Sequence, residues 1–175
     1  MQNAELALLD GIQNLRCGPL DWLMPFLSGL SNHGELWIFL AALLLLLRRQ
    51  RKHGIAAACA LVLDLVFCNM LLKPLIGRTR PFVFRPNLPL LVPPPGDASF
   101  PSGHTAAAFA VVFALRASGS PLWRPALVLA AAIAFSRLYL YVHWPTDIVG
   151  GILLGAAVGW AGARAAETTL ANSQD

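Results

Sequence analysis

Residues 136–163 of the chain read SRLYLYVHWPTDIVGGILLGAAVGWAGA, and this stretch decides the fold. Positions 146–163 form an apolar segment, close to the length that a tilted helix needs to cross the core of a bilayer. Arg137, His143 and Asp147 flank the start of that segment. Charged and titratable groups at the edge of hydrocarbon are costly and usually mark function, so the stretch predicts both a membrane helix and a site.

The rest of the chain has the composition of a membrane protein. Of its 175 residues, 57% are hydrophobic and 13% are charged, whereas soluble domains average about 45–50% and about 25%. Four further apolar segments have a crossing length, at 34–47, 54–72, 102–118 and 122–142. We therefore predict an all-α fold, a polytopic membrane bundle of five to six transmembrane helices that forms a single domain over residues 1–175.

The N-terminal residues 1–31 fit two descriptions. The stretch 19–31 is apolar but short, and it is broken by Pro25 and Gly29. Residues 4–16 carry leucine and isoleucine at helical spacing, as an amphipathic helix does. The segment forms either one irregular crossing or interfacial helices, and we favour a sixth crossing only slightly.

Basic residues orient the bundle. One set of turns and helix ends carries Arg48, Arg49, Arg51, Lys52, Arg116, Arg124 and Arg164. Cationic loops stay in the cytoplasm, so the opposite face is external. That external face nevertheless carries five cations near membrane depth, namely Lys73, Arg78, Arg80, Arg85 and Arg137. A bound anion would account for them, which predicts an active site at the external membrane face.

The block KPLIGRTRP at 73–81 supplies two of these cations. Lys73 and Arg80 are seven residues apart, and Pro74 and Gly77 interrupt a regular helix between them. Both side chains can therefore approach one anion from a loop. The alternative is a pair of cations that reach toward lipid headgroups.

The block PSGH at 101–104 supplies a helix start. Pro101 suits the first turn, so the backbone amides of Ser102, Gly103 and His104 are free to bind an anion at the positive end of the helix dipole. The His104 imidazole can bring a proton to an oxygen that leaves phosphorus. A simple helix cap with a bystander histidine is the alternative.

The third block contains Arg137, His143 and Asp147. Arg137 offers a planar fork for two phosphate oxygens. A carboxylate one turn beyond an imidazole can accept its N–H and fix the tautomer, so that the other nitrogen presents its lone pair. This makes His143 a candidate nucleophile, although His143 and Asp147 taken alone also fit a helix cap.

Taken together, K-x6-RP, PSGH and SR-x5-H-x3-D resemble the signature of the type 2 phosphatidic-acid phosphatase superfamily, in its integral-membrane lipid phosphatase branch. The resemblance spans Lys73 to Asp147. It implies that His143 attacks phosphorus to form a phosphohistidine, that Asp147 orients it, and that His104 protonates the departing oxygen. It also implies that the phosphoryl oxygens are held by Lys73, Arg80, Ser102, Gly103 and Arg137.

Arg78 and Arg85 lie outside that signature. They contact either a second phosphate, as in a diphosphate substrate, or lipid headgroups. No cluster of acids and histidines has the ligand count of a metal-dependent phosphatase, so we expect no cofactor.

The resemblance favours undecaprenyl diphosphate as substrate, in the plasma membrane of a prokaryote. Phosphatidylglycerophosphate or phosphatidate is the alternative substrate, and transfer of the phosphoryl group to another lipid is a further enzymatic alternative. A non-catalytic lipid-binding or transport protein is the alternative from another class. We expect no nucleic-acid partner, because the basic residues form no extended surface with stacking aromatics. Glycines 151, 155 and 159 form a small-residue stripe that suits packing within one chain or a dimer.

Overall fold

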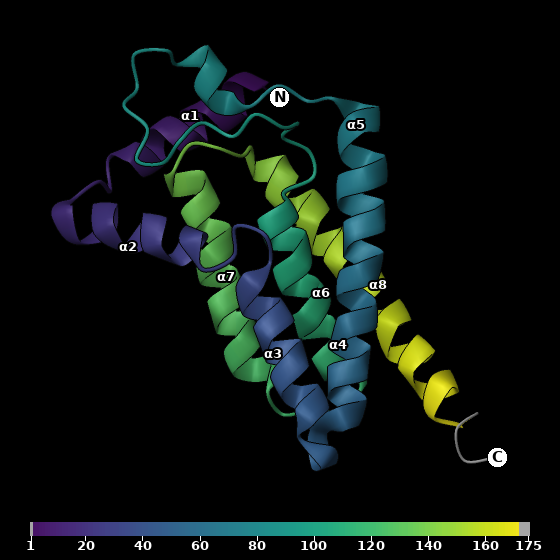
Figure 1. Ribbon diagram of the computed structural model, residues 1–175. Helices are drawn as coiled ribbons and strands as arrows, with labels where there is room; N and C mark the ends of the chain where they lie inside the picture. The colour runs from purple at the N-terminus through teal and green to yellow at the C-terminus, as the bar shows by residue number, and fades with distance from the viewer. Residues whose placement is uncertain (1, 172–175) are drawn as a thin grey trace.

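All five apolar segments fold as helices in the computed structural model, which describes residues 2–171. They form α3 (Glu35–Leu46), α4 (Arg51–Asp64), α6 (Gly103–Ala117), α7 (Trp123–Tyr139) and α8 (Pro145–Ala171). Every regular element among the described residues is helical, which confirms the predicted all-α fold. These five helices run side by side as a bundle (Figure 1).

The fourth helix continues beyond its apolar segment. A π-helical stretch, Leu65–Leu72, joins α4 to the short α5 (Lys73–Ile76), and the three pieces form one rod (Figure 1). Lys73 therefore lies in a helix and not in a loop as predicted, whereas the predicted interruption before Arg80 is present and comes at Gly77. Pro74 occupies the second position of α5, directly after the π-helical turns. Gly77 ends the rod with φ +60°, a left-handed conformation that glycine adopts without strain.

Close packing of α8 on α6 brings two of the sequence blocks together. A Cβ atom on Gly151, Gly155 or Gly159 would lie 2.9, 2.7 or 2.5 Å from a carbonyl oxygen of α6 or of the residue before it. Only glycine allows the two backbones to approach this closely. The stripe therefore serves packing within the chain, and it holds the start of α6 beside the start of α8.

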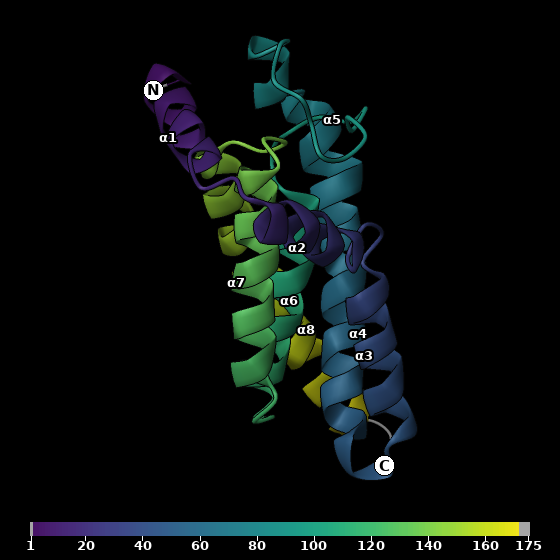
Figure 2. The same cartoon turned by 90° about the vertical axis from the view of Figure 1, so that its left-hand side faces the viewer.

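The N-terminal helices α1 (Gln2–Gln13) and α2 (Gly18–Gly29) lie across one end of the bundle and not alongside it (Figures 1 and 2). Leu6 and Leu9 of α1 pack against Tyr141 and Trp144. Met24 of α2 packs in a neighbouring apolar cluster with Tyr139, Leu140 and Val142. These contacts cover the loop between α7 and α8, so α1 and α2 do not form a sixth helix of the bundle.

The connection from Gly77 to Ser102 lies at the same end of the bundle as α1 and α2 (Figure 1). It contains one short 3-10 helix, Pro81–Phe84, and is otherwise irregular. At the opposite end, a 3-10 turn at Arg48–Gln50 links α3 to α4. The Nδ1 atom of His53 lies 2.8 Å from Oγ of Ser118, which joins this turn to the α6–α7 connection.

The outer faces of the bundle are apolar. Large side chains are exposed on several helices, among them Phe39, Leu46, Val128 and Leu153. Within the described part of the chain, the helical segments Arg48–Phe84 and Pro145–Thr169 are long and apolar enough to cross a membrane. The helices Glu35–Leu46 and Gly103–Ala117 are apolar but shorter.

Candidate active site

A cavity of about 990 Å³ opens at the end of the bundle that α2 covers. Six of the predicted site residues line it, namely Lys73, Arg80, Gly103, His104, Arg137 and His143. They come from three blocks that are far apart in sequence, so the helix packing described above gathers all three blocks at one place.

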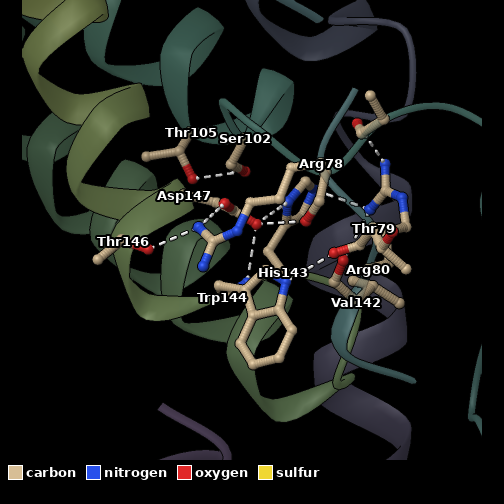
Figure 3. Close-up of polar contacts among 12 residues, drawn as sticks. Arg78, Thr79, Arg80, Ser102, Thr105, Val142, His143, Trp144, Thr146 and Asp147 are labelled. Atoms are coloured by element: carbon tan, nitrogen blue, oxygen red, sulfur yellow. Dashed lines mark hydrogen bonds and ion pairs between the residues drawn. The ribbon is translucent and has the colours of Figure 1, made fainter. Parts of the chain in front are cut away.

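His143 lies in the loop between α7 and α8, with its side chain only 1% exposed. Its Nδ1 atom is 3.3 Å from Oδ2 of Asp147, and its Nε2 atom is 3.2 Å from Nη1 of Arg80 (Figure 3). Because a guanidinium only donates, Nε2 is the atom that accepts and Nδ1 carries the proton. Burial, together with the charges of Arg80 and Arg137, lowers the pKa of this imidazole to about 3 although Asp147 opposes the shift. The ring is therefore neutral, with the lone pair of Nε2 on the side of the cavity.

Asp147 is fully buried behind His143, in the first turn of α8. Its Oδ2 atom accepts hydrogen bonds from the Ser99 hydroxyl and from the Trp144 amide, the latter at 2.9 Å, besides facing the histidine. Its Oδ1 atom accepts from Nη1 of Arg78 at 2.6 Å. The carboxylate thus has a partner on every side, and its orientation is fixed.

Arg78 joins this carboxylate to the N-terminal helix. Its Nη2 atom donates to Oε2 of Glu5 at 2.8 Å, and its guanidinium carbon lies 5.1 Å from the centroid of the Trp144 ring. Glu5 also accepts from both the amide and the hydroxyl of Thr146, at 3.0 and 2.7 Å. The sequence suggested that Arg78 contacts a second phosphate or a lipid headgroup. In the structure, Arg78 instead lies beside Asp147 and away from the cavity.

Lys73 and Arg80 meet at a carboxylate that the sequence patterns did not single out. Oδ1 of Asp97 accepts from Nη2 of Arg80 at 2.7 Å, and Oδ2 accepts from Nζ of Lys73. Arg80 also donates to the carbonyl oxygens of Asp97 and Val142, at 2.9 and 2.7 Å. Although burial raises the pKa of Asp97, its contacts with Lys73 and Arg80 outweigh this and hold the pKa at about 2.

The far wall of the cavity carries Arg137 and His104. Arg137 is buried in the last turn of α7 and donates to the hydroxyl of Ser28 in α2. Nε2 of His104 lies 3.3 Å from Oδ1 of Asn32. Ser28 and Asn32 also line the cavity, so the α2 region contributes polar groups beside the predicted ones.

Ser102 does not join the residues that line the cavity. Its amide donates to the carbonyl oxygen of Asp147 at 3.1 Å, and its hydroxyl accepts from Thr105 at 3.0 Å (Figure 3). The amide therefore ties the start of α6 to α8, and the hydroxyl bond stays within the first turn of α6. Within the described residues, the amides of Gly103 and His104 have no hydrogen-bond partner, so two of the three predicted amides keep the capacity to bind an anion.

Arg85 is likewise outside the cavity. Its Nη2 atom donates to Oδ2 of Asp10 at 2.7 Å, and both side chains are 43% exposed. Asp10 in turn accepts from the hydroxyl of Tyr141 at 2.6 Å. The contact joins α1 to the connection after Pro81–Phe84 and leaves Arg85 away from the cavity.

Sequence reasoning missed the partners of the site. Asp97 and Ser99 stand within four residues of PSGH, and the presence of two polar side chains so close to this block is the signal that could have identified them. Glu5, Ser28 and Asn32 carried no such signal, because they come from N-terminal segments that looked like interfacial helices and a turn.

The cavity also reaches between α3 and α4. Ala41, Leu45, Ala58 and Leu61 line this part, and so does Asp64. Asp64 is buried, and its Oδ1 atom has no hydrogen-bond partner among the described residues. No group of three or more His, Cys, Asp or Glu side chains within the described residues is placed to hold a metal ion.

Known proteins resemble the chain over most of its length. A family model described as the PAP2 superfamily matches residues 53–170. The undecaprenyl-diphosphatase of Sulfolobus acidocaldarius is 37% identical over 138 residues, which cover 78% of the chain and 66% of that protein. The chain thus spans just under two thirds of that relative. The decaprenylphosphoryl-5-phosphoribose phosphatase of Mycobacterium tuberculosis is 39% identical over 137 residues, which cover 75% of the chain and 73% of that protein.

A solved structure has the same arrangement of helices. It is the crystal structure of a transmembrane PAP2-type phosphatidylglycerolphosphate phosphatase from Bacillus subtilis, with a TM-score of 0.74 and 25% sequence identity. The superposition covers 96% of the chain and 86% of that protein.

Proposed function

The chain belongs to the PAP2 superfamily of phosphatases, and from this premise we propose that it is an integral-membrane lipid phosphatase that acts through a phosphohistidine. The observation that carries the proposal is the cavity, where His143 is held between Asp147 and Arg80 and faces His104, Lys73 and Arg137 across one space. An anion site with an oriented imidazole is what phosphoryl transfer through a histidine requires.

The first half of the reaction forms the phosphohistidine. The lone pair of Nε2 of His143 attacks phosphorus, and a new N–P bond forms as the P–O bond to the leaving group breaks. His104 donates a proton to the departing oxygen. Asp147 balances the positive charge that develops on the His143 ring, and the cations of the cavity oppose the negative charge on the phosphoryl oxygens.

The second half of the reaction consumes water. A water molecule attacks the phosphorus and gives a proton to His104, and the N–P bond breaks. Phosphate is released, and both histidines return to their starting protonation states. Since Lys73, Arg80 and Arg137 supply the charge that holds the phosphoryl group, we expect turnover to persist in EDTA.

The proposed enzyme crosses the membrane five times, through α3, the rod of α4 and α5, α6, α7 and α8. The exposed apolar faces of these helices support this arrangement. The basic turn at 48–53 and the α6–α7 connection meet at the end away from the cavity, which supports a cytoplasmic orientation of that end. The cavity then opens at the external face of a prokaryotic plasma membrane, with α1 and α2 at the outer surface.

The proposed substrate is a lipid phosphate or diphosphate, and undecaprenyl diphosphate is our first choice. The name of the Sulfolobus relative supports this choice. Phosphatidylglycerophosphate or phosphatidate is the alternative, in keeping with the name of the Bacillus structure. Apolar side chains of α3 and α4 that line the cavity suit the hydrocarbon part of either lipid.

A substrate panel with purified full-length protein tests the proposal. Phosphate release is measured in detergent from undecaprenyl diphosphate, phosphatidylglycerophosphate and phosphatidate, with His143→Ala as the inactive control. We expect release from at least one lipid, inhibition by vanadate, and a phosphoenzyme that is stable in base and labile in acid. Release of phosphate by the His143→Ala variant at the wild-type rate would refute the mechanism.

The same panel separates the two remaining alternatives, one from another class and one enzymatic. No release from any lipid, together with binding of the same lipids, would favour a non-catalytic lipid-binding or transport protein. Appearance of the phosphoryl group on a second lipid in place of free phosphate would identify a phosphotransferase.

A further inference from the structure

A carboxylate of the chain itself occupies the position between the two cations that were predicted to bind phosphate. Asp97 bridges Lys73 and Arg80, with one oxygen to each. Two cations that face one space attract an anion, and in this structure the anion is a side chain of the connection before α6.

The donors of Arg80 are all engaged in this arrangement. A guanidinium has five N–H groups. Nε donates to the Asp97 carbonyl oxygen, and Nη1 faces the Val142 carbonyl oxygen and Nε2 of His143. Nη2 donates to the Asp97 carboxylate and, at 3.4 Å, to the Ala98 carbonyl oxygen. A phosphoryl group can therefore gain strong hydrogen bonds from Arg80 only by replacing an existing acceptor.

Attack by Nε2 of His143 frees one N–H of Nη1, and burial indicates which further acceptor leaves. The side chains of Arg80 and Lys73 are 4% and 13% exposed, whereas that of Asp97 is 51% exposed. Carbonyl oxygens of Val142 and Asp97 continue to hold Arg80 when the carboxylate moves. The cations are thus the fixed part of the contact, and the carboxylate is the part that is free to turn outward.

We propose that Asp97 is a specificity-determining residue whose carboxylate fills the anion site of the ligand-free protein and is replaced by the phosphoryl group of the substrate. The proposal rests on the proposed phosphatase function. Binding is then an exchange of one anion for another, and its free energy is a difference between the two. A phosphate dianion or a diphosphate has more charge and more acceptor oxygens than a carboxylate and wins the exchange. A singly charged carboxylate ligand gains nothing over Asp97 and is rejected.

A purely structural role for Asp97 predicts the opposite result. If the carboxylate only positioned Lys73 and Arg80, its removal would loosen both cations and weaken the binding of every anion. If the carboxylate competes with the ligand, its removal strengthens that binding. The direction of the change therefore separates the two roles.

The experiment measures the affinity of the purified full-length protein for inorganic phosphate and for vanadate. Calorimetry gives the Kd of phosphate without turnover, and inhibition of phosphate release gives the Ki of vanadate. For Asp97→Asn, which keeps the size of the side chain, we expect both constants to fall by about 10- to 100-fold, the equivalent of one or two charged hydrogen bonds. Asp97→Ala should change them in the same direction.

The matched control is Glu167→Gln, which removes a carboxylate at the other end of the molecule. Glu167 pairs with Arg164 at 3.2 Å, and both side chains are exposed. We expect both constants to stay at their wild-type values. Unchanged or weaker binding by Asp97→Asn would overturn the inference, as would failure of both Asp97 variants to fold. The two failures can be told apart. If the wild-type protein hydrolyses no lipid but the Asp97 variants still bind phosphate more tightly, the inference stands and only the proposed function is refuted.

Discussion

The two nitrogens of His143 face regions that are built differently. On the Nδ1 side, Asp147 is fully buried and accepts hydrogen bonds from Arg78, Ser99 and the Trp144 amide. On the Nε2 side lies a cavity in which charged groups meet a carboxylate at its rim. The groups on the Nδ1 side are buried among other side chains, whereas the Nε2 side faces the cavity.

This difference matches what the proposed mechanism and the proposed exchange of anions require of each side. The proton on Nδ1 and the angle of the ring must stay the same in every cycle, so the groups around Asp147 are fixed by contacts from several segments. The groups near Nε2 must release one anion and accept another. Changes on the Nδ1 side should therefore lower kcat, whereas changes on the Nε2 side should alter the binding of phosphate.

The largest effect within this comparison is expected for Asp147→Asn. The amide leaves no carboxylate to fix the tautomer or to balance the charged imidazole, so we expect kcat to fall by about 10²- to 10⁴-fold. The Kd for inorganic phosphate should stay within about threefold, since Asp147 does not line the cavity. Steady-state kinetics and calorimetry measure the two quantities. A large loss of phosphate binding would break the division between the two sides.

A smaller loss is expected for Arg78→Ala. Arg78 touches Asp147 and Glu5 but does not line the cavity, so it acts on the reaction through the carboxylate. Removal of such a supporting contact costs about 10- to 100-fold in activity, and we expect the loss in kcat with KM little changed. Arg78→Lys keeps the charge and should recover part of the rate. An Arg78→Ala variant with a raised KM and an unchanged kcat would instead assign Arg78 to substrate binding.

The stability of the protein should depend on pH through His143. Burial holds the pKa of this imidazole at about 3 in the folded protein, below its ordinary value of 6.5. As pH falls below 6.5, the unfolded chain gains a proton that the folded protein does not, so stability is lost on the acid side. Between about pH 7.5 and about pH 5 the loss amounts to about 2 kcal/mol.

Thermal unfolding in detergent measures this pH effect. The decrease in Tm between the two pH values should be greater for the wild type than for His143→Gln, whose side chain does not titrate. Equal decreases in both proteins would show that the imidazole is not held neutral between the two regions.

The smallest effect is expected for Arg85→Ala. Arg85 and Asp10 form a half-exposed pair, and such pairs contribute little because solvent screens them. We expect kcat and KM to stay within about twofold of the wild type for a lipid diphosphate as well as for a lipid monophosphate. A selective loss with the diphosphate would restore a second-phosphate contact for Arg85.

The sequence was sufficient for the features that depend on local pattern. Apolar segments predicted the five bundle helices, because a helix that faces lipid or packed neighbours needs little else. The spacing of His143 and Asp147 predicted their contact for a similar reason, since four residues make about one turn. The glycine stripe of α8 predicted a close helix contact, although not which helix would make it.

Features decided by distant partners were beyond local reasoning. A free helix start at Ser102 followed from PSGH alone, but the carbonyl oxygen of Asp147 takes its amide. Residues 1–31 have enough apolar character for either a crossing or an interfacial helix, and their packing against Tyr141 and Val142, across the end of the bundle, could not be predicted from that pattern. Asp97 belongs to an irregular connection, where no periodicity indicates the direction of a side chain.

The contact between Glu5 and Thr146 joins positions 141 residues apart. During synthesis, the first helix therefore has to wait for the last one before either reaches its final surroundings. Contacts of such long range form late, because a long loop must close before they stabilise the chain. A ribosome-bound intermediate that ends before α8 would contain the PSGH block, the cations and His143, while Asp147, the carboxylate that orients the imidazole, is still missing. The protein thus becomes competent only in its final stage of maturation.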